Sequence, residues 1–329
     1  MPLSIEKRRF GGFIRLQRLL PGVLTCAVMA GLPAWGNLII TPTFGASITG
    51  DANAAAIEGV INTAILAYET RYTNPINVTI NFTEMTGGLG QSNTTLYKLP
   101  YATFYAAFRN IAISSGQADQ LTALAHLPSG STNPVNGSAN INIKTAEIRA
   151  LGIAGSFPPS GGFDGQIGLN THITDVGSPG TSGTYSLLVT TEHEIDEVLG
   201  LGSDLPGTGF FADPAPEDLY RYAADGTRSY TTNASAQAFF SIDGTTDLAQ
   251  FDNTNSGSDF GDWLSNPIPN GVQPQVQDAF ATGGAHPALG NEMTALDVLG
   301  YTQESPVPEP STMLLLGCGV VMIGLLKRA

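Results

Sequence analysis

Cysteine is almost missing from this chain of 329 residues. The two that occur, Cys26 and Cys318, lie near the two ends, in segments whose patterns, described below, predict their removal. A body without cysteine forms no disulfide in an oxidising compartment and offers no thiolate to a zinc ion. Any metal that the body binds must therefore be held by His, Asp or Glu.

Charge is also scarce, and basic charge is the scarcer sign. Charged residues make up 13% of the chain, and residues 37–306 contain 7 Lys and Arg against 26 Asp and Glu, a formal charge of −19. Such a body repels nucleic acids and anionic lipids, so we expect no nucleic-acid partner, whereas cations are favoured. Hydrophobic residues still make up 42% of the chain, which is enough to bury a core and argues against disorder.

Residues 1–36 have the pattern of a signal peptide. Five basic residues precede an apolar stretch at 19–32, and Ala34 and Gly36 then occupy the −3 and −1 positions of a cleavage site. This pattern predicts removal of the segment by signal peptidase. An uncleaved anchor is the alternative, although the apolar run is shorter than the roughly 20 residues that cross a bilayer as a helix.

Residues 307–329 have three parts in order. VPEPS at Val307–Ser311 is followed by an apolar stretch of 15 residues and then by the basic pair Lys327 and Arg328. The apolar stretch is only marginally long enough for a transmembrane segment, and the basic pair would stay on the cytoplasmic side.

This tail resembles the PEP-CTERM sorting signal of exopolysaccharide-producing Gram-negative bacteria. The resemblance implies export across the inner membrane, transient anchoring there, and removal of the tail by an exosortase. The mature protein is then expected at the cell surface or in the extracellular matrix, next to the exopolysaccharide. An ordinary C-terminal membrane anchor is the alternative.

Apolar periodicity predicts an α+β fold for the body. Repeats at i, i+3 and i+4 predict helices, and alternation predicts strands. We expect a mixed sheet backed by helices in residues 37–204, with the Gly-rich strand at 163–170 on its edge. Residues 205–306, rich in Gly, Pro, Asp and Asn, form a loop-rich C-terminal subdomain. The expected helices are 51–72, 101–112, 118–126, 185–199 and 292–299, and the expected strands are 76–82, 138–144 and 163–170.

The helix at 185–199 carries a group of polar residues, HEIDEVLG, that begins like the HExxH pattern of zinc peptidases. His193 and Glu194 match this pattern, but Glu197 replaces the second histidine. Residues four apart lie on the same face of a helix, and a carboxylate binds Zn²⁺ at about 2.0–2.2 Å. We therefore expect His193 and Glu197 to hold a metal, with Glu194 beside them as the general base for its water.

A carboxylate in place of histidine changes the chemistry of such a site. It brings a negative charge that weakens the pull of the metal on bound water, so the water pKa is expected above the value near 7 of ordinary zinc hydrolases. Oxygen ligands also favour harder ions than zinc, such as Mn²⁺ or Ca²⁺.

The stretch resembles the zincin metallopeptidases, and in particular the metzincin-like pattern HExxHxxGxxH/D. His193, Glu194 and Gly200 match it. The resemblance implies a third metal ligand where the chain turns back after Gly200. Ser203 occupies the matching position, so Asp204, one residue later, is the candidate ligand. His286 is an alternative ligand, although a surface position in its loop is preferred.

A narrower resemblance is to a group of secreted bacterial proteins that are described as metallopeptidase-like. It implies that Glu197 is a feature of the group, and that a zincin-like sheet presents its edge strand to an extended peptide substrate. The shared motifs, besides HEIDEVLG and the tail, are DLYRY at 218–222, AFFSIDG at 238–244, FGDW at 260–263 and LDVLGY at 296–301.

A second cation is suggested by the stretch FDNTNSGSDFGDW at 251–263. Calcium binds six to eight oxygens, and this stretch offers Asp252, Asn255, Asp259 and Asp262. The spacing does not match an EF-hand, and Asn, Asp and Gly also form ordinary turns, so a structural turn is the alternative.

Two functions remain open for the body. The preferred one is an exported metal-dependent peptidase, and the other is a non-catalytic surface or matrix protein that keeps the zincin-like fold, with or without calcium. A third interpretation is that the acidic residues around His193 form only a solvent-exposed helix face.

Overall fold

The structure is a computed structural model that describes residues 37–176, 183–205, 212–254 and 259–304. The predicted signal peptide at 1–36 and the sorting segment at 307–329 lie outside the described residues. Within the described ranges, no helix is both long and apolar enough to cross a membrane. Residues 37–304 belong to one compact unit.

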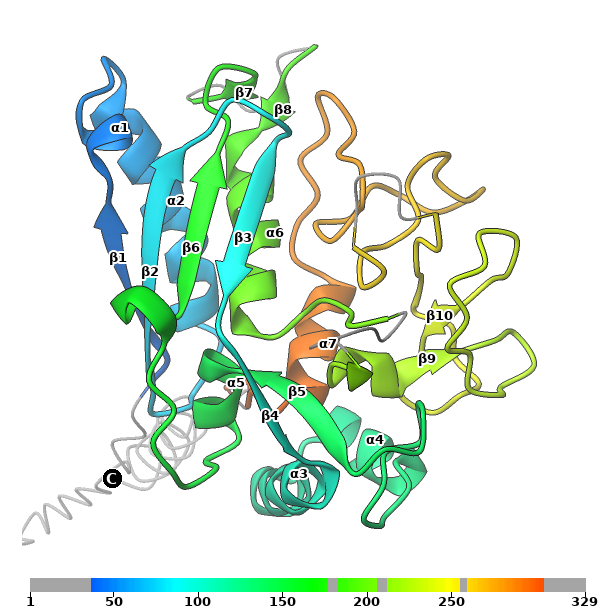
Figure 1. Ribbon diagram of the computed structural model, residues 1–329. Helices are drawn as coiled ribbons and strands as arrows, with labels where there is room; N and C mark the ends of the chain where they lie inside the picture. The colour runs from blue at the N-terminus through cyan, green and yellow to red at the C-terminus, as the bar shows by residue number, and fades with distance from the viewer. Residues whose placement is uncertain (1–36, 177–182, 206–211, 255–258, 305–329) are drawn as a thin grey trace, which may run out of the picture. The chain divides into compact units, whose positions relative to one another are not determined.

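A four-stranded mixed sheet forms one side of the fold (Figure 1). Strands β1 (Ile39–Phe44), β2 (Asn77–Glu84) and β6 (Gly165–Leu169) are parallel neighbours, and β3 (Gly90–Thr94) is antiparallel to β6 at the end of the sheet. The prediction that strand 163–170 is the edge strand was therefore wrong. β6 is an inner strand, and the edge is formed by β3.

The true edge strand had no signal in the sequence. Its residues, GQSNT, are polar and do not alternate with apolar ones, and none of them is fully buried. β6, in contrast, has Ile167 and Leu169 fully buried. Its glycines, which suggested an exposed edge, instead allow close packing: a Cβ on Gly165 would lie 2.2 Å from Cγ2 of Val198.

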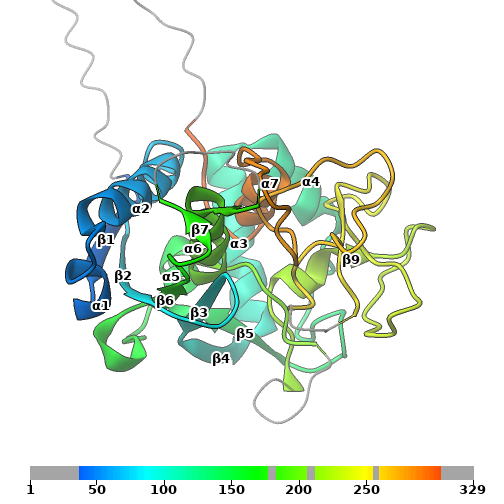
Figure 2. The ribbon, with the colours of Figure 1, turned by 90° about the horizontal axis from the view of Figure 1, so that it is seen from above.

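Two helices, α2 (Ala54–Glu69) and α6 (Leu187–Leu199), lie side by side on one face of this sheet (Figures 1 and 2). Alternate residues of β2, Val78, Ile80 and Phe82, are fully buried. On α2, the buried residues recur at the helical period, as the sequence predicted. They are Ile57, Ile61, Ala64, Ile65 and Tyr68.

Helix α6 is held at both ends. Ser186 caps its N-terminus, because the Ser186 hydroxyl accepts a hydrogen bond of 3.2 Å from the Val189 amide. At the other end, Nζ of Lys144 donates to the carbonyls of Glu197, at 2.6 Å, and Leu201. A cation at this end also complements the helix dipole, so the helix that carries the polar residues is fixed in length and position.

The remaining elements pack around this centre. Helix α7 (Asn291–Val298) contacts α4 (Ala118–His126) and α6, and the loop-rich residues 212–254 and 259–290 lie on the opposite side of α6 from the sheet (Figure 1). Residues Phe239 to Gln250 form a hairpin whose turn includes Asp243. The elements are α1 (Ala46–Thr49), β4 (Leu96–Pro100), α3 (Tyr101–Ser115), α4 (Ala118–His126), β5 (Asn140–Lys144), α5 (Thr145–Ala150), η1 (Ser160–Gly162), β7 (Thr174–Asp175), β8 (Tyr185–Ser186), η3 (Glu217–Tyr220), β9 (Arg221–Tyr222), β10 (Phe239–Phe240), β11 (Ala249–Gln250) and α7 (Asn291–Val298).

The predicted mixture of helices and strands is confirmed. All five expected helices occur, and the strands expected at 76–82 and 138–144 are β2 and β5. The strand pairs β4–β5 and β7–β8 and the small three-stranded sheet β9–β10–β11 stand apart from the main sheet.

Candidate functional site

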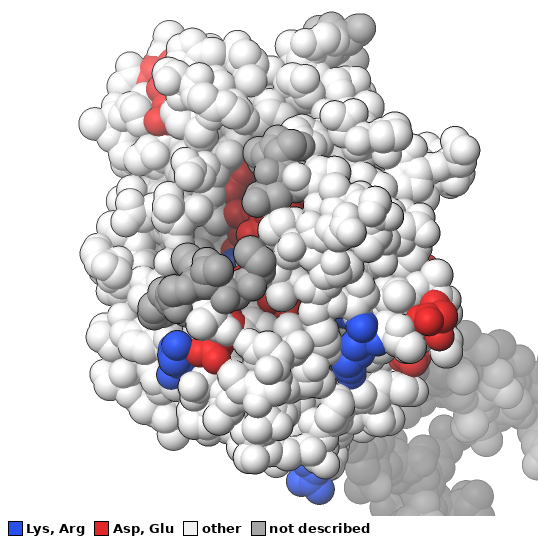
Figure 3. All heavy atoms as spheres, turned by 45° about the vertical axis from the view of Figure 1, so that its right-hand side comes forward, with Lys and Arg blue, Asp and Glu red and all other residues white. Residues whose placement is uncertain are grey.

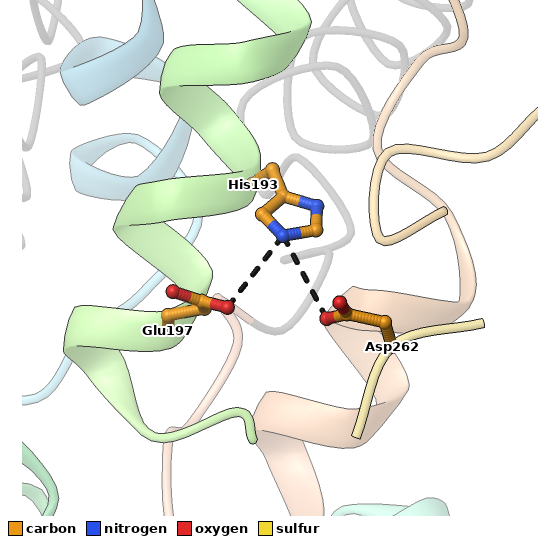
Figure 4. Close-up of side chains that lie close together, drawn as sticks. All are labelled: His193, Glu197 and Asp262. Atoms are coloured by element: carbon orange, nitrogen blue, oxygen red, sulfur yellow. Dashed lines mark ion pairs between the residues drawn. The ribbon is translucent and has the colours of Figure 1, made fainter. Parts of the chain in front are cut away.

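Three side chains from two distant segments converge beside helix α6 (Figure 4). Nε2 of His193 lies 3.6 Å from Oε1 of Glu197 and 3.7 Å from Oδ1 of Asp262. Among the described residues, these three are the only group of at least three His, Cys, Asp or Glu side chains whose ligand atoms all lie within 4.8 Å of one another. The i, i+4 pairing of His193 and Glu197 was predicted, whereas Asp262 in this role was not.

The imidazole of His193 is oriented by a backbone carbonyl. Nδ1 of His193 lies 3.1 Å from the carbonyl oxygen of Val276. In the tautomer that has its proton on Nδ1, the lone pair of Nε2 faces the two carboxylates. Burial lowers the pKa of His193, but the hydrogen bond that His193 donates to Glu197 and the nearby charges of Asp262, Glu197 and Glu194 outweigh burial and raise this pKa well above its usual value. The neighbouring carboxylates thus favour the protonated form of the imidazole.

Asp262 is fixed by the loop around it. Its Oδ2 accepts a hydrogen bond of 2.9 Å from the Asp259 amide, and its Oδ1 accepts one of 3.2 Å from the side-chain amide of Gln277. The loop itself is tied down by the buried Arg221, which donates to the carbonyl of Phe260 and to the side chain of Asn253. Burial raises the pKa of Asp262 to about 7, although His193 opposes this rise.

Glu197 uses its two carboxylate oxygens differently. Oε1 faces His193, and Oε2 accepts a hydrogen bond of 2.5 Å from the hydroxyl of Ser92 on the edge strand β3. Burial alone would raise the pKa of Glu197. The hydrogen bond and charge of His193, the charge of Lys144 and the hydrogen bond of Ser92 outweigh burial and lower the pKa of Glu197 to about 2. The Glu197 carboxylate is therefore ionised at neutral pH.

Glu194 lies next to this group and against the edge strand. A Cβ on Gly90 would come within 2.3 Å of Oε1 of Glu194, so the glycine leaves the space that this carboxylate fills. Oε2 of Glu194 is buried and has no hydrogen-bond partner among the described residues. Burial and the charge of Glu197 raise the pKa of Glu194 well above its usual value.

These residues line a cleft of about 860 Å³ between β3 and the chain at 274–287. Glu194 and Glu197 line it from α6, and Asp259, Asp262 and Asp278 line it from the loops. No Lys or Arg is among its described lining residues. Figure 3 shows acidic side chains at the bottom of a hollow in this face, surrounded by uncharged residues. The described lining therefore offers five carboxyl groups and one imidazole to a cation, with no basic side chain among them.

The predicted third ligand, Asp204, lies elsewhere. Its Oδ2 accepts a hydrogen bond of 2.9 Å from Asn142, and its backbone amide donates to Asp218. The side chain is buried in the loop that follows α6, so the structure brings Asp262 rather than Asp204 to His193. The spacing of the metzincin pattern does not apply here, because the third carboxylate arrives from a different loop 69 positions after His193.

His286 does not join the group either. Its Nε2 lies 3.5 Å from Oδ2 of Asp175 on β7, and its side chain is partly exposed. This placement agrees with the preferred interpretation of a surface histidine in a loop.

The residues proposed for calcium have separate partners. Asp252 accepts from Thr254, Asp259 accepts from the amides of Ser203 and Gly261, and Asp262 faces His193. Asn255 lies outside the described residues, so the calcium site stays a prediction. The sequence signal for Asp262 was nevertheless present, since FGDW was singled out both as a shared motif and as an oxygen-rich stretch.

The acidic residues of α6 do not form a solvent-exposed face. Glu192, Glu194 and Asp196 are 6%, 5% and 0% exposed, so that interpretation was wrong. Glu192 and Asp196 point away from the cleft toward Tyr68 and Glu292, and burial is the main cause that raises the pKa of each. Among the titratable residues of this helix, only His193, Glu194 and Glu197 line the cleft.

Comparison with known proteins identifies the C-terminal tail. No curated protein and no solved structure matches the chain. Residues 306–328 match the family model of the PEP-CTERM protein-sorting motif, which confirms the predicted tail. The chain thus carries the sorting signal of an exosortase substrate, exported and anchored by that signal in the membrane of a Gram-negative bacterium.

Proposed function

We propose that the body of this exported protein is a zincin-like, metal-dependent peptidase that hydrolyses peptide bonds in the cleft beside α6. One observation carries the proposal: an imidazole nitrogen and two carboxylate oxygens face one point, with a buried carboxylate, Glu194, next to them. Histidine nitrogen and carboxylate oxygen are the ligand types of hydrolytic zinc sites, and a carboxylate base stands beside the metal in zinc peptidases; here a second carboxylate replaces the usual second histidine.

The donor atoms fit a small divalent cation. Ligands at about 2.1 Å from a tetrahedral ion lie about 3.4 Å from each other, and Nε2 of His193 is 3.6 and 3.7 Å from the two carboxylate oxygens. The carbonyl of Val276 holds the histidine tautomer that presents Nε2, as is usual for metal-binding histidines. Two carboxylates with one imidazole suit Zn²⁺ or Mn²⁺.

A metal held there would supply an activated water and polarise a substrate carbonyl. His193, Glu197 and Asp262 would bind it, and all three line the cleft that a substrate would enter. Glu194 would take the proton of the water and pass it to the leaving amine. Burial raises the pKa of Glu194, so its ionised carboxylate would accept a proton from the water more readily than a solvent-exposed carboxylate.

The substrate would lie along β3. In the described part of the chain, β3 pairs only with β6, so its outer side is available to an extended peptide. Gly90 and Ser92 on this strand contact Glu194 and Glu197, so a peptide paired with β3 would lie next to the candidate base and ligand. This arrangement supports a peptide substrate over a small molecule.

The experiment compares Glu194→Gln with Glu192→Gln in the full chain. Both residues are buried carboxylates of α6, but only Glu194 faces the cleft. After loading with Zn²⁺ or Mn²⁺, we expect Glu194→Gln to lose roughly 100-fold or more of its rate on unfolded casein, because general base catalysis contributes about 10²–10⁴-fold. Its metal content should stay near one ion per chain, and Glu192→Gln should cleave like the native protein.

The alternative is a non-catalytic matrix protein that keeps the fold. It predicts that the native chain binds one metal ion yet cleaves neither casein nor a mixed peptide library. A native chain that binds no transition metal at all would contradict both the catalytic proposal and the metal-binding form of the alternative.

A further inference from the structure

The edge strand β3 contacts the candidate ligand through a single side chain. The Ser92 hydroxyl donates to Oε2 of Glu197 at 2.5 Å. Along β3, Gly90, Ser92 and Thr94 are partly buried, whereas Gln91 and Asn93 between them are exposed. Ser92 thus lies on the face of β3 that packs against α6, opposite the turn of the helix that carries Glu197.

This hydrogen bond separates the roles of the two oxygens of Glu197. A carboxylate can bind a metal through one oxygen or through both. With Oε2 engaged by Ser92, Oε1 remains directed at Nε2 of His193 and toward Asp262. The bond also fixes the rotation of the carboxylate, so the ligand is held in its binding geometry before a metal arrives.

We infer that Ser92 is a positioning residue for Glu197, which it holds as a one-oxygen ligand so that a coordination position stays open for water. The inference rests on the proposed function. It also joins the two parts of the site, because the strand on which a peptide would pair is the strand that orients a metal ligand. Hydrogen-bond partners of this kind contribute about 10–100-fold to metal affinity.

A purely structural role for Ser92 is the competing explanation. In that case, the hydroxyl only attaches β3 to α6, and its removal lowers the stability of the fold without changing the metal site. The two explanations differ in what happens to a metal bound by the folded chain, so the test must measure binding well below the unfolding temperature.

The test uses the full chain, stripped with a chelator, as the native protein and as Ser92→Ala, Ser92→Thr and Gln91→Ala. Zn²⁺ alone is titrated against a competing indicator, and Co²⁺ is used for visible absorption, which reports the number and geometry of its ligands. Gln91→Ala is the matched control, because Gln91 is the exposed neighbour on the same strand.

We expect Ser92→Ala to bind Zn²⁺ about 10–100-fold more weakly and to give an altered Co²⁺ spectrum. Ser92→Thr keeps the hydroxyl and should restore both, and Gln91→Ala should match the native chain. Equal Zn²⁺ affinity and an identical Co²⁺ spectrum for Ser92→Ala and the native chain would overturn this inference alone. If the native chain binds neither ion, the inference and the proposed function fall together.

Discussion

At the residue scale, the unusual feature is an acid where zinc peptidases have a second histidine. Glu197 and the protonated His193 form an ion pair in the metal-free protein, because each stabilises the charged form of the other. A metal must displace the proton of His193 before it binds. Asp262, held by a separate loop, completes the group, so this loop must be in place before three donors face one point.

The position of Asp262 leads to a prediction about metal affinity. Asp262→Ala should weaken Zn²⁺ binding by more than the roughly 10–100-fold that an outer hydrogen-bond partner contributes, because it removes a direct ligand. Asp204→Ala is the control, since Asp204 is also a buried carboxylate close to α6 but accepts from Asn142 instead. Isothermal titration of both variants measures the difference. If Asp262→Ala and Asp204→Ala lost Zn²⁺ affinity equally, Asp204 would again be a candidate ligand.

At the element scale, the site depends on how closely α6 packs on the sheet. Val198 of α6 touches Gly165 of β6, and Glu194 fills the space left by Gly90 of β3. Two strands therefore approach the helix at residues without side chains. Sequence patterns usually associate such glycines with turns or strand edges, but here they set the distance between the helix and the sheet.

This close packing predicts a specific sensitivity. Gly165→Ala should lower the free energy of unfolding by about 1–3 kcal/mol, because the added methyl group overlaps Val198 in a filled core. Gly59→Ala is the matched control. Gly59 lies on the exposed side of α2 with nothing near its missing Cβ, so alanine there should raise stability by about 0.5–1 kcal/mol. Urea unfolding of the two variants tests whether the free energy of unfolding falls for Gly165→Ala and rises for Gly59→Ala.

At the scale of the whole molecule, part of the excess of Asp and Glu side chains lies buried in the protein interior. Burial raises the pKa values of Glu192, Glu217 and Asp297 to about 8 each. Each of these groups is protonated in the folded protein at pH 6, where an unfolded carboxyl group is ionised. The folded state then binds more protons than the unfolded state, so stability falls as the pH rises.

The metal-free chain should therefore be most stable near pH 5 and lose stability steadily as the pH rises through about 8. Urea midpoints at pH 5.5, 7.0 and 8.5 measure this trend. Glu192→Gln cannot ionise and should make the slope shallower. A midpoint that rises with pH would show that these carboxylates are ionised and paired in the folded chain.

The sequence by itself determined the local features of this protein. The helices at 54–69 and 187–199, the strand at 77–84 and the pairing of His193 with Glu197 follow from periodicities of two and 3.6 residues, which depend only on neighbouring positions. The tail at 306–328 was equally readable, because sorting signals are recognised as linear segments.

Only the tertiary structure decided the rest, because it depends on contacts between residues far apart in the chain. Asp262 reaches His193 across 69 positions, and nothing in the spacing of the helix motif indicates that distance. Ser92 lies in a polar strand without alternation, so neither its place at the sheet edge nor its bond to Glu197 has a local signal. A solvent-exposed acidic face was one interpretation of α6 from the sequence, but Glu192, Glu194 and Asp196 are buried, because the chain packs around both sides of the helix.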